Sequence, residues 1–128
     1  MATIPILSVD QILSAPDRDA KLVEVPQWGG AVKIVPLSKG LQRAVREKSK
    51  KWEIKDGRRV HELDADAFER NLWLESVVEP KFTEAQYDAL KDKNFAAQEV
   101  VLREILAING MAEGAVREAQ KSFPSGPT

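Results

Sequence analysis

The sequence contains no cysteine and only one histidine, His61. Without cysteine the chain has no disulfide bond, thiolate nucleophile or cysteine-ligated zinc, and its composition fits a reducing compartment. His61 has no second histidine or cysteine at the spacing of a metal site, so we expect an ordinary exposed or hydrogen-bonded histidine in preference to a zinc ligand. The sequence therefore predicts no metal centre.

Long apolar runs are also missing from the chain. No window approaches the roughly 18 consecutive apolar residues that a membrane-spanning helix needs. The segment from Met1 to Leu7 has no basic residue and no sustained apolar stretch, whereas a secretory signal requires both. We therefore expect a soluble protein of the cytoplasm that does not bind a membrane.

The chain has no excess charge of either sign, because 19 lysines and arginines oppose 20 aspartates and glutamates, giving a formal net charge of −1. Such a balance creates no general attraction for phosphate. A basic stretch runs from Arg43 to Lys51, but Glu47 interrupts it, and we expect a solvated helix face in preference to a phosphate contact. A DNA-binding regulator using this stretch would also lack helix-turn-helix spacing, so we predict no nucleic-acid partner.

Patterns that perform catalysis or hold cofactors are absent as well. The seven glycines do not form a phosphate-binding loop with a lysine. Ser8 and Ser38 suit helix caps and have no base that the sequence identifies nearby. The acidic residues in the segment 62–69 lack the oxygen spacing of a calcium loop, and Asp64 and Asp66 suit the first turn of a helix better than acid–base chemistry. We expect no enzyme activity and no cofactor.

What the chain does have is the composition of a folded domain. Apolar residues make up 43% and charged residues 30% of its 128 residues, whereas disordered chains combine low hydrophobicity with high charge. A chain of this length buries roughly two thirds of its unfolded surface in one core. We predict a single domain over residues 1–122, followed by a flexible tail at 123–128 with too little apolar content to become ordered.

The first third of the chain predicts a short helix and then a β-hairpin. A capping box that begins at Ser8 indicates a helix ending near Ser14. Apolar residues alternate over residues 21–36, which is typical of half-buried strands, and the pair Gly29-Gly30 supplies the positive φ angles of a tight turn. Two strands are marginal in water, so this hairpin must pack on helices or pair with further strands, of the same or another subunit.

The rest of the chain predicts mainly helices, marked by apolar residues at three- and four-residue steps, by cap residues and by helix stops. Asp56-Gly57 suits a type I′ turn and predicts a loop or a second hairpin within residues 52–61. The fold class that follows is α+β, mainly α-helical, with the N-terminal hairpin packed on a bundle of about four to five helices. These helices are predicted from Ser38 through Lys48, from Asp64 or Asp66 through Val78, from Thr83 to near Lys93, from Phe95 to Asn109 and from Ala112 to Lys121.

Large apolar side chains supply the candidate partner-binding residues. Tryptophan is enriched in binding hot spots because it combines a large area with one hydrogen-bond donor. Trp73 suits the core, together with Phe68 and Leu72. Trp28 either packs within its own chain or contacts a partner. Trp52 either covers the preceding helix or contacts a partner. The candidates for partner binding are Trp28, Trp52, Trp73, Leu90 and Phe95, and the remaining predicted core residues are Val101, Leu102, Ile105, Leu106 and Ile108.

The order of these parts resembles a known family. A short amphipathic opening at residues 8–13 precedes the hairpin sequence Val-Glu-Val-Pro-Gln-Trp-Gly-Gly at 23–30, and helices follow. The segment 77–86, with the sequence Val-Val-Glu-Pro-Lys-Phe-Thr-Glu-Ala-Gln, the helix 99–108 and the closing Asn-Gly-Met at 109–111 resemble the tail assembly chaperones of long-tailed bacteriophages and prophages. The resemblance extends from about residue 5 to residue 122 and rests on packing and turn signals.

The resemblance implies a chaperone that binds the long helical tape measure protein and keeps it soluble while the tail tube assembles. It implies residence in the cytoplasm of the infected or lysogenic bacterium, absence from the mature virion and self-association, and it leaves contact with the tail tube protein open. A tape measure helix exposes apolar stripes before assembly, so we expect matching grooves on the helices of residues 66–108. A structural tail component, such as a terminator or connector subunit, is the alternative function.

Overall fold

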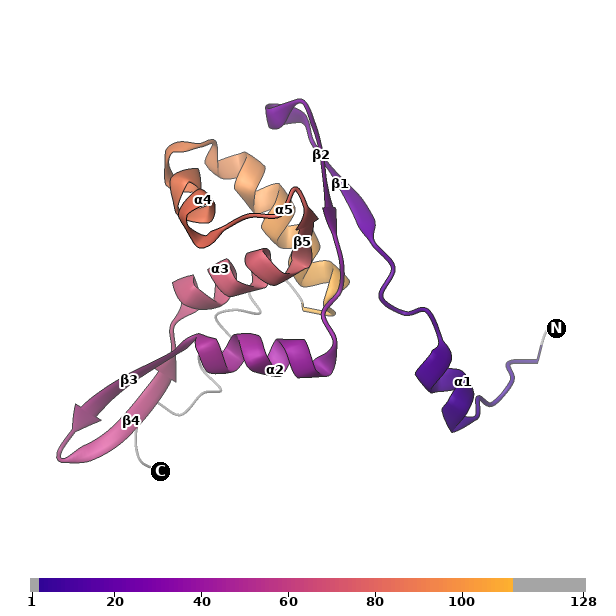
Figure 1. Cartoon of the computed structure of the whole chain (residues 1–128), viewed down its shortest axis with the longest axis horizontal. Helices are drawn as coiled ribbons and strands as arrows, with labels where there is room; N and C mark the ends of the chain where they lie inside the picture. The colour runs from indigo at the N-terminus through magenta and orange to yellow at the C-terminus, as the bar shows by residue number, and fades with distance from the viewer. Residues whose placement is uncertain (1–2, 112–128) are drawn as a thin grey trace.

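The computed structural model describes residues 3–111, over which the chain has an α+β fold that is mainly helical, as predicted. The helix predicted at 112–121 and the tail predicted at 123–128 lie outside the described residues. Helices surround one face of a three-stranded antiparallel sheet, and a separate two-stranded sheet projects from them (Figure 1). The elements in chain order are α1 (Val9–Ser14), β1 (Lys21–Val25), the 3₁₀ helix η1 (Pro26–Trp28), β2 (Gly30–Ile34), α2 (Lys39–Lys48), β3 (Lys50–Lys55), β4 (Arg58–Leu63), α3 (Ala65–Ser76), β5 (Val77–Glu79), α4 (Glu84–Asp88), the 3₁₀ helix η2 (Ala89–Asp92) and α5 (Phe95–Ile108).

The core lies between the inner face of the three-stranded sheet and helices α2, α3 and α5. Alternation in the hairpin is as predicted, because Val23 and Val25 of β1 and Val32 of β2 are buried while Leu22 faces outward. The hairpin packs on α5, and α2 and α5 both pack on α3. The buried cluster consists of Val23, Val25, Val32, Ile34, Leu37, Val45, Leu63, Phe68, Leu72, Trp73, Val77, Ala97, Val101, Ile105 and Leu106, with Leu102 and Ile108 half-buried beside it.

The predicted capping residues open their helices. The Ser8 hydroxyl accepts a hydrogen bond from the Gln11 N–H at 3.1 Å, and the Gln11 side chain accepts one from the Ser8 N–H at 2.8 Å. Thr83 and Gln86 form the same reciprocal pair at the start of α4. Each pair satisfies two backbone N–H groups that a helix start leaves without partners. At the other end of α5, Gly110 takes the predicted left-handed conformation, with φ of 73°.

The predicted helix through Val78 is wrong at its end. Helix α3 stops at Ser76, and Val77 and Val78 instead enter β5, where Val77 lies opposite Ile34 of β2. Two adjacent β-branched residues lose side-chain freedom in a helix and fit a sheet well. The proline at position 80 also pushes the residue before it toward extended backbone. A third strand therefore completes the sheet that the N-terminal hairpin begins.

The two hairpins reverse direction in different ways. In the first, the chain passes through η1 and leaves it at Gly29, which has φ of 72°, whereas Gly30 already belongs to β2. Only one residue of the glycine pair therefore has the positive φ expected of both. The segment 52–61, predicted as a loop or a hairpin, is a hairpin in which Asp56 and Gly57 have φ of 50° and 74°, as a type I′ turn requires.

A buried polar cluster holds the base of the β3–β4 hairpin on the helices. The Ser49 hydroxyl donates to the Val45 carbonyl at 2.7 Å and accepts from the Asn71 amide at 3.1 Å. The Asp64 N–H donates to the Ser49 carbonyl at 2.8 Å. Buried polar groups that are all paired in this way favour one arrangement over competing ones. The hairpin therefore projects from a fixed base between α2 and α3.

Candidate protein-binding surfaces

The N-terminal arm, which we define as residues 3–17, lies apart from the folded body and includes α1 (Figure 1). No residue of α1 is buried. Just beyond the arm, the Arg18 side chain donates to the Pro36 carbonyl at 3.1 Å and ties the chain to the body. The side chains of Ile4 and Ile6 are 87% and 98% exposed, and the large apolar side chains exposed on the arm are Ile4, Ile6, Leu7, Val9, Ile12 and Leu13.

The exposed apolar side chains of the arm indicate that it binds another surface. Val9, Ile12 and Leu13 lie at i, i+3 and i+4 and therefore share one face of α1. A helix of six residues is too short to be stable alone in water, since isolated helices shorter than about 12 residues are marginal. A concentrated group of exposed apolar side chains is typical of a surface that binds another protein. The arm is the most apolar exposed segment among the described residues.

The β3–β4 hairpin carries a second exposed surface. Its register pairs Trp52 with His61 and Ile54 with Arg59, so these four residues share one face with Lys50 at its base. We call these five residues the basic–aromatic face. The Arg59 guanidinium carbon lies 4.2 Å from the centre of the Trp52 ring, and the His61 ring centre lies 4.7 Å from it. Trp52 is 46% and Ile54 77% exposed, so both remain accessible to a partner.

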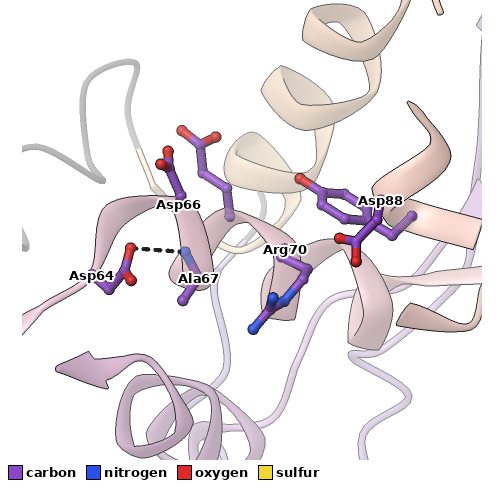
Figure 2. Close-up of a pocket in the computed structure, with 7 residues that line it drawn as sticks. Asp64, Asp66, Ala67, Arg70 and Asp88 are labelled. Atoms are coloured by element: carbon purple, nitrogen blue, oxygen red, sulfur yellow. Dashed lines mark hydrogen bonds between the residues drawn. The ribbon is translucent and has the colours of Figure 1, made fainter. Parts of the chain in front are cut away.

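An acidic hollow lies between the start of α3 and α4 (Figure 2). Asp64, Asp66 and Arg70 come from α3 or its cap, and Asp88 faces them from α4. Asp64, one of the two residues predicted to begin this helix, is its cap, since its carboxylate accepts from the Ala67 N–H at 3.2 Å. No group of histidine, cysteine, aspartate or glutamate side chains within residues 3–111 could hold a metal ion. The lining of the hollow has four carboxylates, those of Asp64, Asp66, Glu69 and Asp88, against the one guanidinium of Arg70.

Two groups of the hollow have shifted pKa values. Burial raises the pKa of Glu69 above its ordinary value of 4.5, and the negative charges of Asp66 and Glu99 raise it further. Burial likewise raises the pKa of Tyr87, with Glu69 as the largest charge contribution. Since a raised carboxyl pKa means that the folded chain disfavours the charged form, ionised Glu69 destabilises the fold.

Replacing Glu69 by glutamine should therefore raise the melting temperature at neutral pH. Between pH 4.5 and the raised pKa, the folded wild-type chain binds more protons than the unfolded chain, so its stability falls as the pH rises through this window. The advantage of Glu69→Gln should disappear below pH 4.5, where the wild-type carboxyl is protonated in both states. Thermal unfolding of both proteins across this range measures the effect, and Glu24→Gln on the exposed part of β1 is the control. A variant that is less stable than wild type at neutral pH would contradict this account.

The structure does not bring the five candidate residues together. Trp73 is buried in the core, and Trp28 and Leu90 are half-buried against it. Trp52 and Phe95 are exposed, on β3 and at the start of α5 respectively. Sequence reasoning missed the arm and Arg59 as binding residues. One signal could have indicated the arm, since its apolar residues precede the hairpin and the proline at position 16 separates them from the body.

A smaller apolar surface lies on the outer face of the three-stranded sheet. Leu22 of β1 is 67% exposed there. Lys33 and Glu79 form an ion pair across β2 and β5 at 3.1 Å. A shallow hollow on this face is lined by Leu22, Ala31, Lys33, Glu79 and Pro80. With one ion pair at its centre, this face is less apolar than the arm.

Comparison of the chain with protein-family models, curated proteins and solved structures found no match. Within residues 3–111, no helix is both long enough and apolar enough to span a membrane. The surfaces described above are therefore the basis for a functional proposal, together with the resemblance noted in the sequence.

Proposed function

We propose that this chain is a tail assembly chaperone that binds the tape measure protein and keeps it soluble in the bacterial cytoplasm while the tail tube assembles. The observation that carries the proposal is the N-terminal arm, with its six exposed large apolar side chains beside an otherwise well-packed body. The resemblance to tail assembly chaperones supports the same function. On this proposal the protein is absent from the mature virion.

The arm suits a helical client for a physical reason. An unassembled tape measure helix exposes an apolar stripe, and two short apolar helices can bury their stripes against each other. Ile12 and Leu13 are 53% and 79% exposed, so each still has apolar area to bury. Fully burying such a side chain contributes roughly 1.5–3 kcal/mol, from which the cost of ordering the arm and the client must be subtracted.

The grooves expected on the helices of residues 66–108 are not part of this proposal. The large apolar residues there that fill the core include Phe68, Leu72, Val101 and Ile105, which are at most 1% exposed. Residues that fill the core cannot also contact a client without unfolding the body. The proposed client-binding segment is therefore the arm, which was not among the partner-binding residues predicted from the sequence.

A structural tail component remains the second candidate, because the arm and the β3–β4 hairpin both project from the body (Figure 1). Projecting segments are common where subunits interlock in permanent assemblies. Mass spectrometry of purified virions separates the two functions. A structural subunit would be present in every particle, whereas a chaperone would be missing.

The direct test is co-expression with the tape measure protein, followed by co-purification and measurement of the soluble tape measure fraction. We expect a complex with the wild-type chain, and with Ile12→Asp/Leu13→Asp a dissociation constant at least about tenfold higher, since loss of roughly 1.4 kcal/mol suffices for that change. Ala85→Asp, at an exposed position in the first turn of α4 and outside the arm, is the control and should bind as wild type does. Failure of the wild-type chain to retain or solubilise the tape measure protein would refute the proposed function.

A further inference from the structure

The arm and the β3–β4 hairpin lie at opposite ends of the molecule. In Figure 1, the hairpin lies at the left end of the longest axis and α1 toward its right end, with α2 and α3 between them. The chain that follows the arm is fixed to the body at the end far from the hairpin. The Arg18 hydrogen bond and the pairing of β1 with β2 hold it there. In this arrangement the two projections of one copy do not meet, whereas the arm of one copy can contact the hairpin of another.

The arm is apolar and acidic. Residues 3–17 contain two aspartates, Asp10 and Asp17, and no lysine, arginine or histidine, so the arm has a formal charge of −2. On α1, Asp10 lies about 60° around the helix from Leu13, at 100° per residue, so it borders the apolar face. A partner surface that covers this face should therefore be apolar at its centre and basic at its rim.

The basic–aromatic face has this complementary chemistry. Its exposed centre consists of Trp52 and Ile54, and Arg59 packs on the Trp52 ring. The register places the acidic residues of both strands, Glu53 and Glu62, on the opposite face. On this face itself the basic residues are Lys50, which forms an ion pair with Glu47 at the base of the hairpin, and Arg59 next to the turn. Charge and apolarity therefore match those of the arm.

We infer that the arm of one copy binds the basic–aromatic face of a second copy. In this contact Val9, Ile12 and Leu13 pack on Trp52 and Ile54, and Asp10 pairs with Arg59. The packing of Arg59 on Trp52 holds the guanidinium in place before binding, which reduces the entropy lost on association.

The contact joins two different surfaces, so each copy offers one free arm and one free face. Such a heterologous contact produces rings where the rotation closes and open chains where it does not. Each added copy covers one arm that would otherwise remain exposed. If the arm also binds the tape measure protein, client and neighbouring copy compete for it; this consequence rests on the proposed function, whereas the contact between copies does not.

The test uses the purified full chain alone, in sedimentation velocity over a range of concentrations. We expect species larger than a monomer that dissociate on dilution and with added salt, because exposed ion pairs are screened. Asp10→Arg and Arg59→Glu should each raise the dissociation constant about tenfold or more, and the double exchange Asp10→Arg/Arg59→Glu should recover most of the affinity. Thermal unfolding of each variant confirms that the body is folded.

A mixing experiment identifies the two surfaces. The arm variant Ile12→Asp/Leu13→Asp keeps an intact face, and the face variant Ile54→Asp/Arg59→Glu keeps an intact arm. Each alone should be monomeric, and an equimolar mixture should form a dimer that grows no further. A wild-type chain that is monomeric up to its solubility limit, variants that still assemble, or a mixture that stays monomeric would each overturn the inference. None of these outcomes bears on binding of the tape measure protein, which is measured separately.

Discussion

Replacing Trp73 by alanine is expected to lower the free energy of unfolding by about 3–5 kcal/mol, the usual cost of removing a buried tryptophan. Trp73 is only 2% exposed. Its ring meets Phe82 and Tyr87 edge-on, with ring centres 5.6 and 5.7 Å away. Because Phe82 and Tyr87 lie before and within α4, the cavity would also detach α4 from α3. Chemical denaturation measures the loss, and protease cleavage near α4 should become faster.

Two further substitutions test this account of Trp73. Phe95→Ala removes an aromatic side chain that is 75% exposed, so it should change the free energy of unfolding by less than about 0.5 kcal/mol. Trp73→Phe should cost less than Trp73→Ala, because the ring is retained in part and the buried Trp73 Nε1, which has no hydrogen-bond partner, is removed. Equal losses for Trp73→Ala and Phe95→Ala would show that Trp73 is not a core residue.

Replacing Asn109 by alanine should lower the free energy of unfolding by about 1–3 kcal/mol, the cost of leaving a buried donor without a partner. The Asn109 Oδ1 accepts from the Leu37 N–H at 2.7 Å, and its Nδ2 donates to the Ile105 carbonyl at 2.8 Å and to the Ser76 hydroxyl at 3.4 Å. One amide thus joins the end of α5, the end of α3 and the segment before α2. Chemical denaturation, with hydrogen exchange at Leu37, measures the effect.

Gln42→Ala is the matched control for Asn109. The Gln42 side chain donates to the same Asn109 Oδ1, but at 3.5 Å, the outer limit of a hydrogen bond. Its removal leaves the Leu37 contact intact, so we expect a loss below about 0.5 kcal/mol. A loss as large as that of Asn109→Ala would mean that the side-chain contact between Gln42 and Asn109, and not the Leu37 bond, stabilises this junction.

Local features of the fold could be predicted because neighbouring residues create them. Both capping boxes depend on side chains three residues apart, and Asp56-Gly57 makes a type I′ turn from its own backbone preferences. The burial of Val23 and Val25 follows from alternation along one strand. The buried stripe of α5, including Val101 and Ile105, follows from the helical repeat. None of these features requires knowledge of distant residues.

The end of α3 could not be placed from local signals alone. Val77 and Val78 continue an apolar helical pattern, yet Val77 lies in the sheet opposite Ile34, which is distant in the sequence. Pairing with β2 and burial of Val77 outweigh a weak local preference for helix. Val77 can pair with Ile34 only because the hairpin packs on α5, which places β2 beside the end of α3.

The candidate binding surfaces were predictable to a smaller extent. Trp52 and Phe95 were named as partner-binding residues and are exposed, whereas Trp73 fills the core. The sequence does not determine which apolar residues the core excludes, because that depends on how the whole chain packs. Ile12 and Leu13 resemble core residues by type and spacing, and only the detached position of α1 leaves them exposed. Binding of the tape measure protein stays a prediction.

The sequence by itself determined the fold class, the helix starts, the hairpin alternation and the absence of catalytic patterns, because these depend on residue type and on spacings of a few positions. The tertiary structure alone decided that the apolar arm stands apart from the body, and that Trp52, Ile54 and Arg59 gather on one face of β3–β4, opposite the face that carries Glu53 and Glu62. Which apolar residues remain uncovered is a property of the whole packed chain, since a core of fixed shape accepts some and excludes the rest.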